Sequence, residues 1–179
     1  MRKILFGLII ATVAFACNNA EVKSTTDTKA TTAATKPPTD LPYTAGYESN
    51  WSDNVSDADL KMVLVTYKDW ADNNMPGLEA ALADTVTIDM SDGSHLVKPK
   101  ADVINLWKLH RDSLSSVNIK MDAWHKMYAT DKGDQYVVTW YDEYDTYKDG
   151  KVDSASYHDI NQIKNGKLVW YSQYRRPKR

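Results

Sequence analysis

Residues 135–175 read QYVVTWYDEYDTY-KDGK-VDSASYHDINQI-KNGK-LVWYSQYR, three β-rich segments separated by two turn tetrapeptides. Aromatic and β-branched residues favour strands. Asp149-Gly150 and Asn165-Gly166 supply the positive φ angles that tight hairpin turns need. Before them, residues 117–130 alternate apolar and polar side chains and end at the turn 131–134. The sequence therefore predicts a four-strand antiparallel meander over 117–130, 135–147, 152–163 and 168–175.

Helical spacing dominates the residues before this meander. Ser56 and Asp59 form a capping box with a shortened acid, and apolar residues recur at helical spacing from there to Ala71. Pro76 suits the first turn of a second, short helix, and residues 85–90 are β-rich. A third helix is expected from Lys100, with a buried stripe of Val103, Leu106, Trp107, His110 and Leu114. Together these elements predict an α+β fold in which a curved antiparallel sheet wraps around the long first helix.

Length and composition limit the chain to one globular domain with appendages. It has 179 residues, with 22 Lys plus Arg against 24 Asp plus Glu. A formal net charge of −2 offers no large basic surface for nucleic acid, so we expect no nucleic-acid partner. A single Cys excludes an intramolecular disulfide and a Cys-based zinc site. The four His show no paired ligand spacing, so we expect neither a metal nor a cofactor.

The N-terminus has the composition of an export signal. Met1-Arg2-Lys3 is basic, and residues 4–16 carry no charge but are fewer than the roughly 18 that span a bilayer. Ala14-Phe15-Ala16-Cys17 resembles a bacterial lipobox, and ordinary secretion with cleavage at the same bond is the alternative. We expect a signal peptide over 1–16, a lipid on Cys17 as the membrane anchor, and a place in the cell envelope as an outer-membrane lipoprotein facing the periplasm or the outside.

The residues after the export signal are rich in Thr, Ala, Lys and Pro. This composition buries too little apolar surface to offset the entropy of ordering the chain. We therefore expect a disordered tether over 17–50, a globular domain over 51–176 and a basic tail over 177–179.

Three stretches carry a resemblance to a known superfamily. They are residues 66–70 (Thr-Tyr-Lys-Asp-Trp), residues 78–89, and the Gly166-Lys167-Leu168 hairpin. With the order of elements, they resemble the nuclear transport factor 2-like (NTF2-like) superfamily, in particular its SnoaL-like and ketosteroid-isomerase-like branch. The resemblance covers residues 56–174 and implies a cone-shaped domain with a pocket between the concave sheet face and the helices. It also implies dimerisation through the outer sheet face, which makes a homodimer an expected assembly.

The ketosteroid-isomerase branch implies candidate catalytic residues. Its enolisation chemistry uses a carboxylate base, a tyrosine donor and a protonated aspartate. Tyr67 matches the family's tyrosine, and Asp159 matches its aspartate. The base position falls on Met90, and Asp89 reaches it only with a one-residue gap, so the acid–base set is not completely matched.

Strand alternation decides which side chains line such a pocket. Trp140, Asp142 and Tyr144 share one strand face, which we expect to point into the cone; in the alternative, Asp142 belongs to a solvated acidic strand. His158 and Asp159 are neighbours, so only one of them can line the pocket. A three-residue loop at 148–150 would place Trp140 opposite His158, whereas a two-residue turn would place it opposite Asp159.

Three functions are compatible with these features. The leading hypothesis is an exported lipoprotein that binds a small, partly apolar molecule, without established catalysis, in a pocket lined by Tyr67, Trp70, Trp107, Trp140 and Tyr144. The second is a ketosteroid-isomerase-like or polyketide-cyclase-like isomerase, cyclase or dehydratase in which Asp142, His158 or Asp159 exchanges a proton. The third is a structural module whose exposed sheet face pairs with itself or with an envelope partner.

Overall fold

The computed structural model describes residues 42–43, 45–47 and 49–178. The chain divides into two compact units, Met1–Thr44 and Ala45–Arg179, and every helix and strand given below lies in the second unit. The predicted signal peptide, Cys17 and most of the predicted tether lie outside the described residues. Within the described ranges, no helix combines the length and apolar character needed to cross a bilayer.

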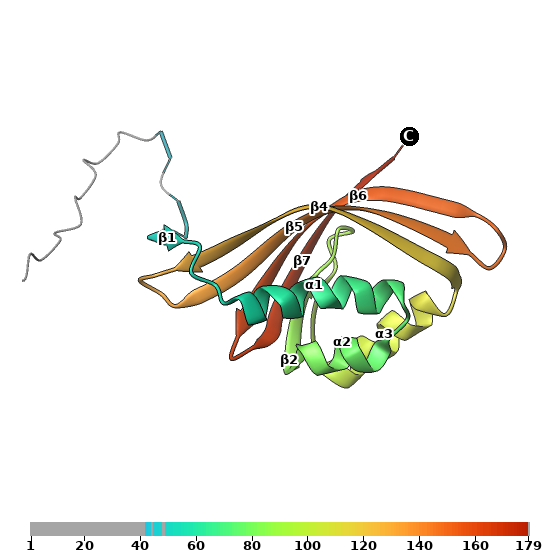
Figure 1. Cartoon of the computed structure of the whole chain (residues 1–179), viewed down its shortest axis with the longest axis horizontal. Coiled ribbons are helices and arrows are strands. Elements are labelled where there is room, and N and C mark those ends of the chain that lie inside the picture. Colours follow the sequence, from blue (N-terminus) through green and yellow to red (C-terminus); the bar gives the residue numbers. More distant parts are fainter. Residues whose placement is uncertain (1–41, 44, 48, 179) are drawn as a thin grey trace, which may run out of the picture. The chain divides into compact units, whose positions relative to one another are not determined.

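Seven strands form one curved, mixed sheet in the order β1-β4-β5-β6-β7-β2-β3 (Figure 1). Their bounds are Trp51–Ser52 (β1), Leu82–Asp89 (β2), His95–Pro99 (β3), Leu114–Ala129 (β4), Asp134–Tyr147 (β5), Val152–Lys164 (β6) and Lys167–Pro177 (β7). Strands β4 to β7 pair antiparallel in sequence order, which confirms the predicted meander. Strand β2 pairs parallel with β7. The prediction of a wholly antiparallel sheet is therefore wrong at this pair of strands. Strands β1 and β3 were not predicted.

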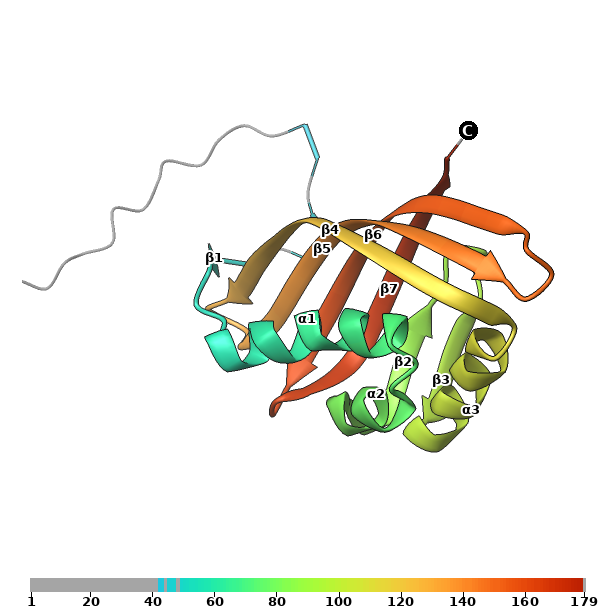
Figure 2. The same ribbon diagram turned by 45° about the vertical axis from the view of Figure 1, so that its right-hand side comes forward.

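Three helices cover one face of this sheet. They are α1 (Asp57–Ala71), α2 (Met75–Ala81) and α3 (Lys100–Arg111). The predicted cap of α1 is present, because the Ser56 hydroxyl accepts the backbone N–H of Asp59 at 3.0 Å. Figures 1 and 2 show α1 running across the meander, while α2 and α3 gather beside β2 and β3. The predicted α+β architecture, with the sheet curved around the first helix, is confirmed.

The buried face of α3 differs from the predicted stripe. Val103 and Ile104 are buried, whereas Leu106 is 44% exposed and His110 is exposed. Leu114, the last residue of the expected stripe, belongs to β4. The reason is that α3 packs against α2, β2 and β3 together, and the sequence did not predict β3 as one of these neighbours.

The hairpin between β5 and β6 shows which of the two predicted pairings of Trp140, with His158 or with Asp159, is present. Tyr147 and Lys151 pair through a 2.8 Å backbone hydrogen bond, and Gly150 has a φ of 86°. This is the three-residue loop with a left-handed glycine. It places Trp140 opposite His158.

One hydrophobic core lies between the three helices and the concave face of the sheet. Its fully buried members are Val55 just before α1, Val63 of α1, Val86 and Ile88 of β2, Val103 of α3 and Val137 of β5. Tyr67 and Tyr141 belong to the same cluster and extend it toward β6 and β7. The core therefore ends in a layer of phenol rings.

Candidate functional site

A cavity of about 180 Å³ lies between the helices and the concave sheet face. An apolar cavity of about 150 Å³ is enough to hold benzene, so the space suits a molecule with about one ring. His110 lines the cavity and is exposed, so the cavity reaches the surface beside the end of α3. The lining residues are Thr66, Tyr67 and Trp70 of α1, Leu78 of α2, Leu82 of β2, Met90 directly after β2, Trp107 and His110 of α3, Tyr141, Glu143 and Asp145 of β5, Tyr157 and Asn161 of β6, and Leu168, Tyr171 and Gln173 of β7.

Three of the lining tyrosines converge on one buried carboxyl behind the cavity wall. Tyr141, Tyr67 and Tyr171 donate to the same oxygen of Asp159, Oδ2, at 2.9, 3.1 and 3.1 Å. The other oxygen, Oδ1, has no hydrogen-bond partner among the described residues. Burial raises the pKa of Asp159 to about 7, although the three hydroxyls act in the opposite direction. Asp159 is itself absent from the cavity lining, because the tyrosine rings separate it from the open space.

The Tyr67 hydroxyl is held by further buried partners. It lies 2.6 Å from the Thr139 hydroxyl and accepts the Asn161 side-chain amide at 3.1 Å. Its ring packs edge-on against Tyr141 with 4.9 Å between centroids. Burial raises the pKa of Tyr67 well above its usual value, so the phenol stays neutral. The arrangement fixes the ring as a rigid wall of the cavity.

Two carboxyls of β5 face the cavity from the same strand face. Glu143 and Asp145 are 9% and 7% exposed and both line the space. Burial, together with the negative charge of Asp145, raises the pKa of Glu143 to about 8, and the Trp70 indole, a hydrogen-bond donor to Glu143, opposes this shift. Burial also raises the pKa of Asp145, against the opposing charges of His110 and Arg111. The pair therefore retains a proton near neutral pH.

Aromatic rings complete the walls, and an arginine outside the lining joins the helices that carry them. The Trp70 ring stacks on His110 with 5.9 Å between centroids, and Tyr141 stacks on Tyr157 at 5.1 Å. The Arg111 guanidinium donates to the backbone carbonyls of Trp70 and Ala71 at 3.1 and 3.0 Å. This joins the end of α3 to the end of α1, so the two helices hold the cavity between them.

The chain was compared with family models, curated proteins and solved structures. No family model matches the chain, and no curated protein matches it. Solved structures do match. An LEH-like epoxide hydrolase from M. tuberculosis is 10% identical over 66% of this chain and 83% of that chain, with a TM-score of 0.57. An NTF2-like protein of unknown function from Burkholderia pseudomallei is 16% identical over 66% and 91%, with a TM-score of 0.53.

A third similar structure is a hypothetical protein with a ketosteroid isomerase-like fold from Catenulispora acidiphila, in complex with trimethylamine. It is 11% identical over 64% of this chain and 84% of that chain, with a TM-score of 0.53. This chain has the NTF2-like fold. At 10–16% identity the likeness to these three structures shows the fold alone.

The NTF2-like domain brings three of the five expected pocket residues to the cavity. Tyr67, Trp70 and Trp107 line it. Trp140 and Tyr144 lie on the opposite face of β5, because neighbouring residues of a strand point to opposite faces and the odd-numbered residues of β5 face the helices. This placement corrects the strand face expected from the sequence.

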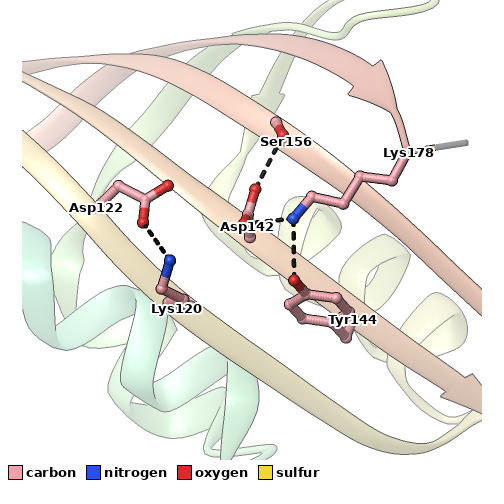
Figure 3. Close-up of polar contacts among 6 residues, drawn as sticks. All are labelled: Lys120, Asp122, Asp142, Tyr144, Ser156 and Lys178. Carbon is pink, nitrogen blue, oxygen red and sulfur yellow. Dashed lines mark hydrogen bonds and ion pairs between the residues drawn. The ribbon is translucent and has the colours of Figure 1, made fainter.

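Asp142 and His158, two of the three expected catalytic residues, share that outer face. Figure 3 shows Asp142 between Ser156, which donates to it at 2.9 Å, and Lys178, which forms an ion pair with it and also donates to Tyr144 at 2.9 Å. These donors hold the pKa of Asp142 below its ordinary value. His158 stacks on Trp140 with 4.7 Å between ring centroids. Lys178, expected in a basic tail, is thus anchored to the sheet.

The alternative base also lies outside the cavity of the NTF2-like domain. Asp89 is bonded to the His95 ring and to the Trp170 indole, each at 2.6 Å, and Met90 takes the cavity position instead. Of the acid–base groups named from the sequence, Tyr67 therefore lines the cavity, whereas none of the candidate carboxyls and neither ring nitrogen of His158 does. Sequence reasoning missed Glu143, Asp145, Tyr157, Tyr171 and Gln173. No group of three or more His, Cys, Asp or Glu in the described part of the chain could hold a metal ion.

Proposed function

We propose that the NTF2-like domain binds a small, partly apolar organic molecule in the cavity between α1, α2, α3 and the concave sheet face. The observation that carries the proposal is about 180 Å³ of space walled by Tyr and Trp rings, with two carboxyls, Glu143 and Asp145, on β5. Ligand sites are typically concave, mostly apolar and furnished with a few polar groups that orient the ligand.

A thermal-unfolding screen tests this proposal. Single-ring alcohols, ketones and amines are added to the full chain, and a binder present at about 100 times its Kd stabilises the folded state by about 2.7 kcal/mol. The variant Met90→Trp, which fills part of the cavity, should lose this stabilisation, whereas Tyr144→Phe on the outer face should keep it. A screen in which no compound stabilises the wild-type protein would count against binding in this cavity.

A second candidate function is proton-transfer catalysis by Glu143. The observation that favours it is a buried carboxyl at the cavity wall whose pKa, about 8, lies near the working range of a general acid or base. Exchange of the α-hydrogens of cyclohexanone in D2O, followed by proton NMR, measures enolisation directly. Catalysis by wild type that is lost in Glu143→Gln supports this function, and a wild-type rate equal to buffer alone removes it for this ketone.

We also propose that Cys17 carries a lipid that anchors the chain in the cell envelope. The support is the sequence Ala14-Phe15-Ala16-Cys17 after an uncharged run. Replacing Cys17 with Ser and comparing membrane and soluble fractions tests it. A Cys17→Ser variant that stays as membrane-bound as wild type contradicts the lipid anchor.

A further inference from the structure

We propose that the cavity selects a positively charged ligand, an alkylammonium group held by the Glu143 and Asp145 carboxyls and the surrounding aromatic rings. This inference rests on the proposed binding function and specifies the charge class of the ligand. Three observations carry it: the two carboxyls share one strand face, the neighbouring arginines bind other groups, and aromatic rings line the cavity.

No Lys or Arg lines the cavity beside the carboxyl pair, and among the described residues His110 is the one lining side chain that can carry a positive charge. Glu143 and Asp145 are two residues apart on one strand face, so both project into the same space. Asp145 is 7% exposed, and its Oδ1 is buried without a hydrogen-bond partner among the described residues. A buried charge without a partner is costly, and a ligand that supplies the opposite charge removes that cost.

The nearby arginines are already engaged by other groups. Arg175 donates to the Asp153 carboxylate at 2.6 Å and to the Tyr157 hydroxyl at 3.1 Å. Arg111 is bound to backbone carbonyls, including that of Leu114 at 3.4 Å. Neither guanidinium lines the cavity.

The other charged or titratable groups around the pair are few. From α3 comes His110, which stacks on Trp70, and from β6 come Asp153, paired with Arg175, and the buried Asp159. Tyr67, Tyr141, Tyr157 and Tyr171 complete the set, and burial raises the pKa of each phenol, so these four groups are neutral. Four carboxyls against two arginines leave an excess of negative charge at this end of the cavity when the carboxyls are ionised.

Ring faces in this region accept cations. The Arg175 guanidinium already lies 5.9 Å from the centroid of the Tyr157 ring. Trp70, Trp107 and Tyr157 line the cavity with the two carboxyls. Aromatic faces attract ammonium groups electrostatically, and the attraction strengthens when water is excluded. Carboxyls on one wall and rings on the others therefore suit a cation better than a neutral or anionic molecule.

The proton held by the pair gives the proposal a measurable signature. Burial and mutual repulsion favour a retained proton, with the pKa of Glu143 raised to about 8. A bound ammonium supplies the positive charge that this proton supplies in the empty cavity. Binding of a cation should therefore release protons near neutral pH and strengthen as the pH rises, because more of the protein already has the ionised pair.

Titration calorimetry with choline and its neutral isostere 3,3-dimethylbutan-1-ol tests the charge preference on the full chain. Choline carries a fixed charge, so any pH dependence of its affinity comes from groups of the protein that titrate. We expect choline to bind at least about tenfold more tightly at pH 9 than at pH 6 and at least about tenfold more tightly than the alcohol at pH 9, while the alcohol changes by less than about twofold. Choline titrations in two buffers with different ionisation enthalpies should show net proton release at pH 7.

Two variants and the alcohol separate the outcomes. Glu143→Gln should lose the preference for choline and its pH dependence while still binding the alcohol, and Asp142→Asn, on the other face of the same strand, should keep both. Equal affinities for choline and the alcohol, or no proton release by wild type, overturn the cation inference and leave the binding function standing. If neither compound binds and the wider screen also fails, the binding function itself is contradicted. Proton release is measured on wild type, so it does not depend on the folding of Glu143→Gln.

Discussion

Asp159 accepts three phenol hydroxyls through one oxygen, in a site with no water-exposed surface. Burial raises its pKa to about 7 in the folded protein, against a value near 4 for an unfolded chain. Between these two values the folded protein holds a proton that the unfolded chain has released. The contribution of this residue to stability is therefore largest below about pH 4, decreases as the pH rises to about 7, and then stays constant.

The variant Asp159→Asn tests this reasoning at one residue. The amide oxygen is still a hydrogen-bond acceptor for the tyrosine hydroxyls, but the side chain cannot ionise. From pH 5 to pH 8 the free energy of unfolding of wild type should fall by roughly 2–3 kcal/mol more than that of the variant, at about 1.4 kcal/mol per pKa unit. Urea denaturation at both pH values measures the difference. Equal decreases for the two proteins would show that Asp159 ionises as easily in the folded protein as in the unfolded chain.

At the scale of the elements, the sequence predicts strands better than it predicts their faces. The four meander strands and the cap of α1 follow from turn glycines, alternation and Ser56, which are local signals. The faces of β5 do not, because its neighbouring residues are chemically alike: Val137 and Val138, Trp140 and Tyr141, Asp142 and Glu143. The sequence of β5 alone therefore does not show which of its two faces packs against the helices.

A combination of two signals could have found the cavity face. Placing Asp159 on the helix side, as the family resemblance implies, and choosing the three-residue loop at 148–150 puts Thr139 opposite Asp159 and therefore on the helix side. Glu143 and Asp145 then follow by alternation. The two missed strands had weaker signals, since β1 has two residues and β3 is an edge strand that ends at Pro99.

Cysteine reactivity checks the faces of β5. In a Cys17→Ser background, Tyr144→Cys and Glu143→Cys place one thiol on each face of the strand. Tyr144 is 36% exposed and Glu143 is 9% exposed, so a charged maleimide should react at least about tenfold faster with the Tyr144→Cys variant. Unfolding in urea should make the two rates equal, which controls for intrinsic reactivity. Faster labelling of Glu143→Cys in the folded protein would place the cavity on the wrong side of the sheet.

At the scale of the whole molecule, the folded unit begins a few residues before its first strand. The Tyr47 hydroxyl donates to Asp134 at 2.6 Å, and the Trp51 ring packs against Tyr136 with 6.2 Å between centroids. Asn50 accepts the backbone N–H of Thr130 at 2.9 Å, beside the two-residue pairing of β1 with β4. These contacts all lie within the unit Ala45–Arg179, so the stability of this unit should not depend on residues 1–44.

Two truncated chains test where the folded unit begins. A chain that starts at residue 45 keeps every contact of Tyr47 and Trp51 named above, and its free energy of unfolding should equal that of the full chain within about 0.5 kcal/mol. A chain that starts at residue 53 loses β1, two backbone pairings and the Trp51 ring, and should be less stable by about 2 kcal/mol. Urea denaturation followed by tryptophan fluorescence measures both differences. A similar decrease in the free energy of unfolding of both truncated chains would mean that residues before 45 stabilise the domain. The tether would then be part of the fold that holds the cavity.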